Sequence, residues 1–305
     1  MTSRTALLSP SLPPPVRPGE AVGVAAISGP VDPQRLERGI AALEGLGLHP
    51  VPAENLLSTG GLFAGSDAER LEGFHRLAAD PSIRAIFFAR GGHGALRILD
   101  RIDWDLLARH PRAYIGYSDL TPFLLAVVAR LGLVAFHGPM VAADLARGLS
   151  AEEEESLMGC LRGDFPRPLA CRPTAGTGVV EGPLLGGCLS MLTATLGTPF
   201  SPSLDGSILF WEEVGEPPYR IDRMLTHLRL SDTLASIAGM VIGHITWPPS
   251  AEPVESWRLL ADDILSAPPW PVATSLLSGH ECPNLTLPLG HWARLDLDQR
   301  QLVLG

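Results

Sequence analysis

The first half of the chain repeats short apolar runs separated by segments with helical spacing, and this alternation limits the folds available to it. Each apolar run lacks a polar face, as expected of a strand that is buried on both sides. Such strands alternating with helices predict a parallel sheet covered on both faces. The expected strands are 21–30, 83–90, 112–118 and 133–139, and the expected helices are 32–47, 67–80, 95–110 and 121–132. We therefore predict a doubly wound α/β domain over residues 1–162.

A second domain is expected because the composition then changes. Ser150 and Glu153 have the spacing of a helix capping box, which gives the acidic run after Ser150 a structural explanation. Residues 163–177 are rich in Pro and Gly and have no helical period, which predicts a linker. Residues 178–305 mix short strands, turn signals and one or two helices, so we predict a smaller β-rich C-terminal domain. A chain of 305 residues is long enough for two cores.

Charge and composition exclude several classes of protein. The formal net charge is −10 and the basic residues are scattered, so no nucleic-acid partner is expected. No run approaches the roughly 20 apolar residues of a membrane span, and prolines at 10 and 13–15 interrupt the N-terminal apolar patch. Neither a membrane nor an export signal is therefore expected. The four cysteines form no CxxC pair, which favours a reducing cytoplasm.

Ser118 lies where the strand 112–118 is expected to meet a helix with Thr121 as its N-cap and Pro122 as its first residue. In open α/β sheets, ligands bind beyond the carboxyl ends of the strands. The first N–H groups of such a helix also supply positive partial charge where an oxyanion could develop. Ser118 is thus a candidate nucleophile, and the alternative is a serine that only turns or caps the chain.

The preceding strand ends in Arg90, Gly91 and Gly92. Paired glycines let a backbone approach a ligand closely and donate N–H groups to it. A phosphate cradle is a competing interpretation, but the segment lacks the spacing and the lysine of a P-loop. A tight turn with no further role would also explain the glycines.

A nucleophilic serine needs a base, and the base needs an acid to orient it. His280 follows an expected strand and a glycine, while His137, His244 and His291 also follow apolar runs and remain candidates. The acid candidates are Glu212 and Glu213, at the end of another expected strand. Adjacent strand residues point to opposite faces, so one of them can enter a shared site, and the period alone does not choose which. A solvated strand end is the alternative.

The order of several short motifs resembles the serine LD-carboxypeptidases, a family that includes murein tetrapeptide carboxypeptidases and microcin C self-immunity peptidases. The motifs are ARGGHG, IGYSDLT, HGP, GPLLGG, LFWEEVGEPPYRIDRML and GHECPNLTLPLG. Each is modest by itself, but together and in this order they are specific. The resemblance covers about Gly19 to Gly290.

The resemblance implies a catalytic triad of Ser118, His280 and Glu212, with the N–H groups of Gly92 and Asp119 as the oxyanion hole. It also implies a two-domain fold, a homodimer and a reaction that needs no metal or organic cofactor. Two positions depart from the family pattern: Cys188 stands where the family usually has Asn after GPLLGG, and His93 stands where an aromatic residue often follows RGG.

The substrate implied by the resemblance is a peptide amide next to a D-residue, as in the terminal D-Ala of a muropeptide tetrapeptide in cell-wall recycling. A carboxypeptidase also needs a cation for the terminal carboxylate, a role that suits arginine. The candidates are Arg90, Arg220 and Arg223, while Glu216 is expected either to contact substrate or to pair with a nearby arginine.

Three other functions remain open from the sequence. The chain could instead cleave an aminoacyl or peptidyl nucleotide, for which Trp211 and Trp247 are candidate stacking residues. Cys188 could be the nucleophile of a cysteine hydrolase, although a free buried cysteine is usually inert. The chain could also bind a ligand without turning it over.

Overall fold

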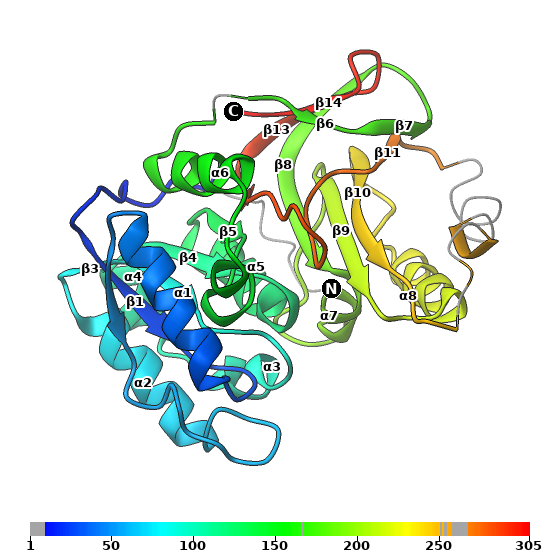
Figure 1. The fold of residues 1–305 in the computed structure, drawn as a ribbon. Coiled ribbons are helices and arrows are strands. Elements are labelled where there is room, and N and C mark those ends of the chain that lie inside the picture. Colours follow the sequence, from blue (N-terminus) through cyan, green and yellow to red (C-terminus); the bar gives the residue numbers. More distant parts are fainter. Residues whose placement is uncertain (1–9, 166, 251, 253–254, 258–267) are drawn as a thin grey trace.

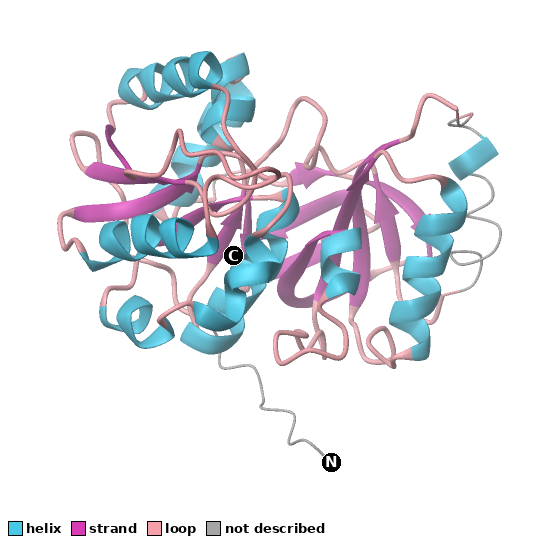
Figure 2. Cartoon of the chain, turned by 90° about the horizontal axis from the view of Figure 1, so that it is seen from below, coloured by secondary structure: helices cyan, strands magenta, loops and turns pink. Residues whose placement is uncertain are grey.

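The chain forms two sheets that lie side by side, with helices packed around the first (Figures 1 and 2). The structure is a computed structural model that describes residues 10–165, 167–250, 252, 255–257 and 268–305. Part of the N-terminal patch discussed above, residues 1–9, lies outside the described residues. Among the residues described, no helix has both the length and the apolar character needed to cross a membrane.

The first sheet has six strands in the order β12-β5-β4-β3-β1-β2. These strands are β1 (Ala21–Ala25), β2 (His49–Pro52), β3 (Ile83–Phe88), β4 (Ala113–Gly116), β5 (Ala135–His137) and β12 (Leu287–Leu289). Neighbours from β2 to β5 pair in parallel, and β12 pairs antiparallel with β5. The predicted α/β class with a parallel sheet is therefore confirmed, and its edge is closed by a strand from the far end of the chain.

Helices lie on both sides of this sheet (Figure 2). They are α1 (Pro33–Gly45), α2 (Asp67–Ala79), α3 (Ala95–Ile98), α4 (Trp104–Arg109), α5 (Thr121–Leu131) and α6 (Ala151–Arg162). Local sequence explains their starts: Asp32 caps α1 through the N–H of Arg35, and Ser150 with Glu153 forms the expected capping box of α6. Strands β3 and β4 are almost completely buried, as their apolar composition predicts.

Two local predictions were wrong, and one strand was not predicted. The single helix expected over 95–110 is interrupted, because Asp103 accepts a hydrogen bond from the N–H of Leu106 and starts α4. Strand β2 was not foreseen, since its two prolines are typical of an edge strand and disguise it. Thr121 is not an N-cap: α5 follows a 3₁₀ turn, and the Thr121 hydroxyl accepts a hydrogen bond from the N–H of Cys188 instead.

The second sheet has eight strands in the order β6-β14-β13-β8-β9-β10-β11-β7. They are β6 (Leu169–Ala170), β7 (Arg172–Ala175), β8 (Val179–Cys188), β9 (Ile208–Val214), β10 (Gly239–Thr246), β11 (Val272–Thr274), β13 (Trp292–Asp296) and β14 (Gln301–Leu304). Helices α7 (Leu189–Ala194) and α8 (Pro218–Leu230) accompany it. This sheet is the predicted β-rich part of the chain.

One strand of the C-terminal part belongs to the first sheet. The segment 163–177 contains β6 and β7, which pair within the second sheet, while β12 pairs within the first. The division into 1–162, 163–177 and 178–305 stays a prediction, and the pairing of β12 with β5 places one strand from the third range in the sheet of the first.

Close packing of α1 gives a test of the fold. A Cβ added at Gly39 would lie 1.9 Å from the carbonyl oxygen of Val141, whereas one added at Gly45, in the same helix, meets nothing within 4 Å. We expect Gly39→Ala to lower the free energy of unfolding by about 3 kcal/mol, because the backbone there must move. Gly45→Ala should raise it by about 0.5–1 kcal/mol through helix propensity. Urea denaturation measures both, and equal effects would contradict this packing.

Candidate active site

Ser118 occupies a strained turn between β4 and α5. Its φ is 62°, in the left-handed region that residues other than glycine rarely adopt, and it begins the 3₁₀ turn Ser118–Leu120. Strain of this kind persists where the surrounding structure enforces it, and it is common at functional sites. A serine on a sharp strand-to-helix turn is also the geometry of a nucleophile elbow.

The turn after β3 lies directly against Ser118. A Cβ added at Gly91 would be 3.0 Å from the Ser118 Cβ and 3.1 Å from its Oγ, and 3.6 Å from the Asp119 nitrogen. Only glycine therefore fits at position 91 without pressing on the serine. The next residue, Gly92, has a φ of 105°, which also favours glycine. The glycine pair thus brings the backbone of this turn beside both Ser118 and Asp119.

The Asp119 side chain anchors the turn rather than facing solvent. It is buried, and its Oδ2 accepts hydrogen bonds from Ser28 Oγ at 2.7 Å and from the N–H of Ala95 at 2.8 Å. These bonds connect the start of the Ser118 turn to the loops that follow β1 and β3. The backbone N–H of Asp119 is held in place as a result.

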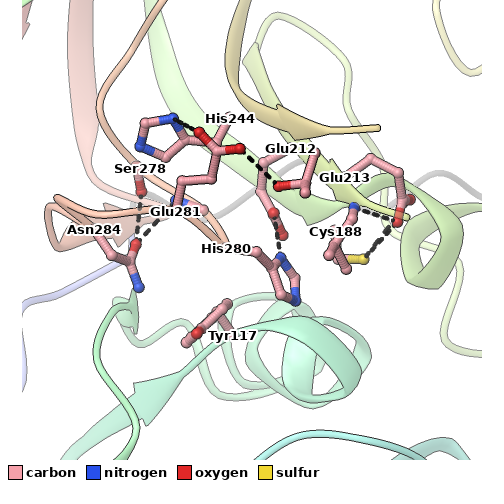
Figure 3. A network of polar contacts seen from close by, with 12 residues as sticks. Tyr117, Cys188, Glu212, Glu213, His244, Ser278, His280, Glu281 and Asn284 are labelled. Atoms are coloured by element: carbon pink, nitrogen blue, oxygen red, sulfur yellow. Dashed lines mark hydrogen bonds and ion pairs between the residues drawn. The ribbon is translucent and has the colours of Figure 1, made fainter. Parts of the chain in front are cut away.

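A buried carboxylate pairs with an imidazole where the two sheets meet. Glu212 is in β9, and His280 is in the loop between β11 and β12. His280 Nδ1 lies 2.6 Å from Glu212 Oε2, and this contact is the dashed line between them in Figure 3. Gly279 permits the approach, since its φ is 129° and a Cβ there would lie 2.9 Å from the same carboxylate oxygen. When Nδ1 donates to the carboxylate, Nε2 is the nitrogen left to accept a proton.

The structure distinguishes the two adjacent glutamates. Glu213 points to the other side of β9, where its carboxylate accepts hydrogen bonds from the N–H of Ser190 at 2.7 Å and of Val214 at 2.9 Å. Burial raises its pKa, and the nearby Glu212 charge adds to that increase. Glu212 and Glu213 are both buried, so the alternative of a solvated strand end is wrong.

Tyr117 connects the Ser118 turn with the imidazole. It directly precedes Ser118, and its ring meets the His280 ring edge to face with centroids 4.9 Å apart (Figure 3). Cys188 and Glu212 are paired neighbours on β8 and β9, and Cys188 is bonded to Thr121 at the start of α5. The serine turn and the carboxylate–imidazole pair therefore share one region between the sheets.

The pKa of His280 is raised above its ordinary value. Burial of the ring opposes protonation, but the hydrogen bond to Glu212 and the negative charges of Glu212, Glu213 and Asp144 outweigh it. An imidazole that gains affinity for a proton in this way is suited to act as a general base.

The other candidate histidines lie in different environments. His137 is completely buried between Tyr117 and Phe210, and burial lowers its pKa to about 3. His244 Nε2 is hydrogen-bonded to the carbonyl oxygen of Pro283, and the ring of His291 packs on Phe165. Among the histidines whose contacts are described, His280 is the one paired with a buried carboxylate.

Cys188 has the properties of a packing residue. Burial and the charges of Glu212 and Glu213 raise the pKa of its thiol well above the ordinary value. A thiol in this state supplies little thiolate, which is the nucleophilic form. The cysteine that stands here in place of the family's usual asparagine is therefore a neutral, buried group beside Glu212.

The predicted substrate-binding residues have different partners. Arg90 is exposed beside the glycine turn and donates to the carbonyl of Pro30 at 2.9 Å. Arg220 forms an ion pair with Glu216 at 3.2 Å. Pairing with a nearby arginine was one of the two roles expected for Glu216. The guanidinium of Arg223 lies over the ring of Tyr219, 5.4 Å from its centroid. Of the three arginines, Arg90 is the one that directly precedes Gly91, which lies against Ser118.

The tryptophans offer little to a nucleobase. Trp211 is completely buried and donates its indole N–H to Met240 Sδ at 3.2 Å, so it belongs to the core. Trp247 is half-buried and packs against the same core.

Sequence reasoning missed Tyr117 and Asn284, which shape the site. It also assigned Glu153 only to a helix cap. Asn284 accepts a hydrogen bond from the N–H of Gly279, next to His280, and donates its own N–H to Glu153. Nothing local marks the bond between Asn284 and Glu153, since it joins positions 131 residues apart. Among the described residues, no group of three or more His, Cys, Asp or Glu side chains could hold a metal ion.

A strained serine thus lies beside a glycine turn, in the same region as a buried carboxylate–imidazole pair, and these are side-chain types that peptidases use to cleave amide bonds. The chain belongs to the LD-carboxypeptidase family of peptidases: the model of its N-terminal domain matches residues 22–138, and that of its C-terminal domain matches residues 181–295.

Individual relatives agree with this assignment. A Bacillus subtilis protein named as a probable murein peptide carboxypeptidase is 34% identical, with 94% of this chain and 92% of that protein covered. The crystal structure of muramoyltetrapeptide carboxypeptidase from Oxalobacter formigenes has a TM-score of 0.80 and 30% identity, with 93% of this chain and 97% of that chain covered. The microcin C7 self-immunity protein MccF of Escherichia coli is 26% identical, with 97% and 96% covered.

The cause of the raised His280 pKa can be tested directly. We expect Glu212→Gln to bring the pKa of His280 below the ordinary value, because the charge is lost while burial, which lowers the pKa, remains. Glu213→Gln, one residue away, should lower it less, since Glu213 acts on the ring only through its charge. NMR titration of ¹³C-labelled histidine measures both, with His280→Gln assigning the resonance. Equal shifts in the two variants would contradict this explanation.

Proposed function

We propose that the chain is a serine-type LD-carboxypeptidase in which Ser118 is the nucleophile, His280 the general base and Glu212 the orienting acid. Its substrate would be a muropeptide tetrapeptide, cleaved at the amide bond before the terminal D-residue. The observation that carries the proposal is the 2.6 Å contact between His280 and Glu212 in the region of the strained Ser118 turn.

In this mechanism, His280 Nε2 takes the Ser118 proton as Oγ attacks the amide carbonyl. Glu212 holds the proton on Nδ1 and stabilises the imidazolium that forms. The N–H groups of Gly92 and Asp119 donate to the oxyanion of the tetrahedral intermediate. His280 then protonates the leaving amine, and water attacks the acyl-enzyme to release the shortened peptide.

The substrate class is supported by the names of the relatives that match over nearly the whole chain, which refer to murein peptides and a muramoyltetrapeptide. Cleavage of an aminoacyl nucleotide is the alternative, supported by the less similar MccF. Burial of Trp211 removes one of the two expected stacking residues for a nucleobase. The peptide substrate is therefore the better supported of the two.

Location and assembly complete the proposal. The four cysteines are all free, which is consistent with a reducing cytoplasm. The family resemblance implies a homodimer.

Assays of Ser118→Ala test the nucleophile. We expect wild type to release the terminal D-residue from an L,D-linked tetrapeptide, and Ser118→Ala to lower kcat/KM by about 10³-fold or more, because no acyl-enzyme can form. Cys188→Ala is the matched control and should keep most of the activity. Mass spectrometry follows the products, with an aminoacyl sulfamoyl adenylate as the second substrate.

The possible results separate the alternatives. Loss of turnover in Cys188→Ala but not in Ser118→Ala would assign a cysteine nucleophile. Ligand binding without turnover in either form would indicate a non-catalytic binding protein. Cleavage of the adenylate alone would reject the muropeptide substrate.

We further propose that Arg90 binds the substrate's terminal carboxylate, because Arg220 is already paired with Glu216 and Arg223 stacks on Tyr219. Arg90→Gln should raise KM for the tetrapeptide about 10-fold to 100-fold, the effect of losing a hydrogen bond to a charged group. With a C-terminally amidated tetrapeptide, the variant and wild type should differ little. Arg220→Gln is the control, and a similar KM effect in it would count against Arg90.

A further inference from the structure

We propose that Glu153, a buried glutamate of α6, is a positioning residue that holds the loop bearing His280 against the first domain. This inference rests on the proposed function, since it assumes that His280 is the base. Glu153 lies in the acidic run whose spacing predicts only a helix cap.

The carboxylate of Glu153 is completely buried and makes contacts on both sides. Its Oε2 accepts a hydrogen bond from the N–H of Ser150 at 2.8 Å, which is the capping contact. Its Oε1 accepts from the N–H of Asn284 at 2.8 Å and from Arg147 Nη2 at 2.7 Å. The contact with Asn284 joins positions 131 residues apart, so the residue does more than begin a helix.

Another helix of this chain shows what a cap alone requires. Ser66 and Glu69 form the same capping box at the start of α2, and the Glu69 carboxylate is bonded only to Ser66 among the contacts described. Glu69 is exposed. The burial of Glu153 and its bond to a residue 131 positions away are therefore additional to capping.

The bond to Asn284 fixes the backbone on which His280 is carried. Asn284 Oδ1 accepts a hydrogen bond from the N–H of Gly279 at 2.9 Å (Figure 3). The ends of the loop are joined by a bond from the N–H of Leu285 to the carbonyl of Leu277 at 2.8 Å. Residues 277–285 thus form a closed loop. Glu153 is hydrogen-bonded to Asn284, and Asn284 is in turn hydrogen-bonded to Gly279, the residue that precedes His280.

A second chain of contacts leads from Glu153 to the imidazole ring itself. Arg147, paired with Glu153, also lies 3.9 Å from Asp144. The Tyr117 hydroxyl is 3.5 Å from Asp144, and the Tyr117 ring packs on His280. Glu153 therefore supports both the loop backbone and the wall against which the imidazole rests.

The charge of Glu153 is compensated despite its burial. Burial alone would raise its pKa, but Arg147 and the N–H groups of Asn284 and Ser150 lower it below the ordinary value. The ionised carboxylate can accept all of these hydrogen bonds at once, which a neutral side chain cannot do.

The test compares Glu153→Ala with Ser150→Ala, which removes the hydroxyl that caps the same helix but leaves the bond to Asn284. We expect Glu153→Ala to lower kcat on the tetrapeptide about 10-fold to 100-fold with little change in KM, because small misplacement of a catalytic group costs that much. Ser150→Ala and Glu69→Ala should keep kcat within about 3-fold, since surface caps affect stability rather than the loop. Glu153→Gln keeps one oxygen that can accept from Asn284 but loses the charge that pairs with Arg147, so it should recover part of the loss.

Hydrogen exchange of the peptide covering 277–285 gives a measure that needs no turnover. The loop amides should exchange faster in Glu153→Ala and remain protected in Ser150→Ala. An unchanged loop, or a kcat in Glu153→Ala equal to that of Ser150→Ala, would overturn the role of Glu153. Inactive wild type, or active Ser118→Ala, would instead reject the proposed function, and the exchange data would still decide whether Glu153 holds the loop.

Discussion

The hydrogen bond between His280 and the buried carboxylate of Glu212 is the interaction on which the rest of the site depends. A carboxylate removed from water is costly unless it has a partner, and the imidazole is that partner. The pair forms only because a loop between β11 and β12 returns to β9, and because Gly279 leaves room for the carboxylate. Because the pair lies between the two sheets, the packing of the sheets against each other also positions the groups proposed for catalysis.

The interface is built so that neither half can place these groups alone. Strand β12 leaves the second part of the chain and pairs with β5 in the first sheet. In the opposite direction, the start of α5 accepts a hydrogen bond from Cys188 at the end of β8. The Glu153 carboxylate adds a buried hydrogen bond from the N–H of Asn284, in the loop that carries His280. These crossings fix the Ser118 turn and His280 relative to each other, which a flexible linker would not do.

Much of this could be predicted from local sequence. The four central parallel strands, most helices and the capping box of α6 follow from apolar periodicity and from short-range hydrogen bonding, which neighbouring residues decide. The elements that were missed or misplaced each have an identifiable cause. Two prolines disguise β2, Asp103 divides the helix expected over 95–110, and the Thr121 hydroxyl serves Cys188 rather than its own helix.

The sequence alone determined the α/β class, the strand end that carries Ser118 and, through the order of its motifs, the family and the three residues proposed for catalysis. Only the tertiary structure showed Glu212 bonded to His280 while Glu213 is bonded on the opposite side of β9, paired Arg220 with Glu216, and showed that Glu153 reaches the His280 loop. Periodicity states which face of an element a side chain occupies, but not what lies opposite. That depends on contacts between residues far apart in the chain, which form only when both sheets have packed.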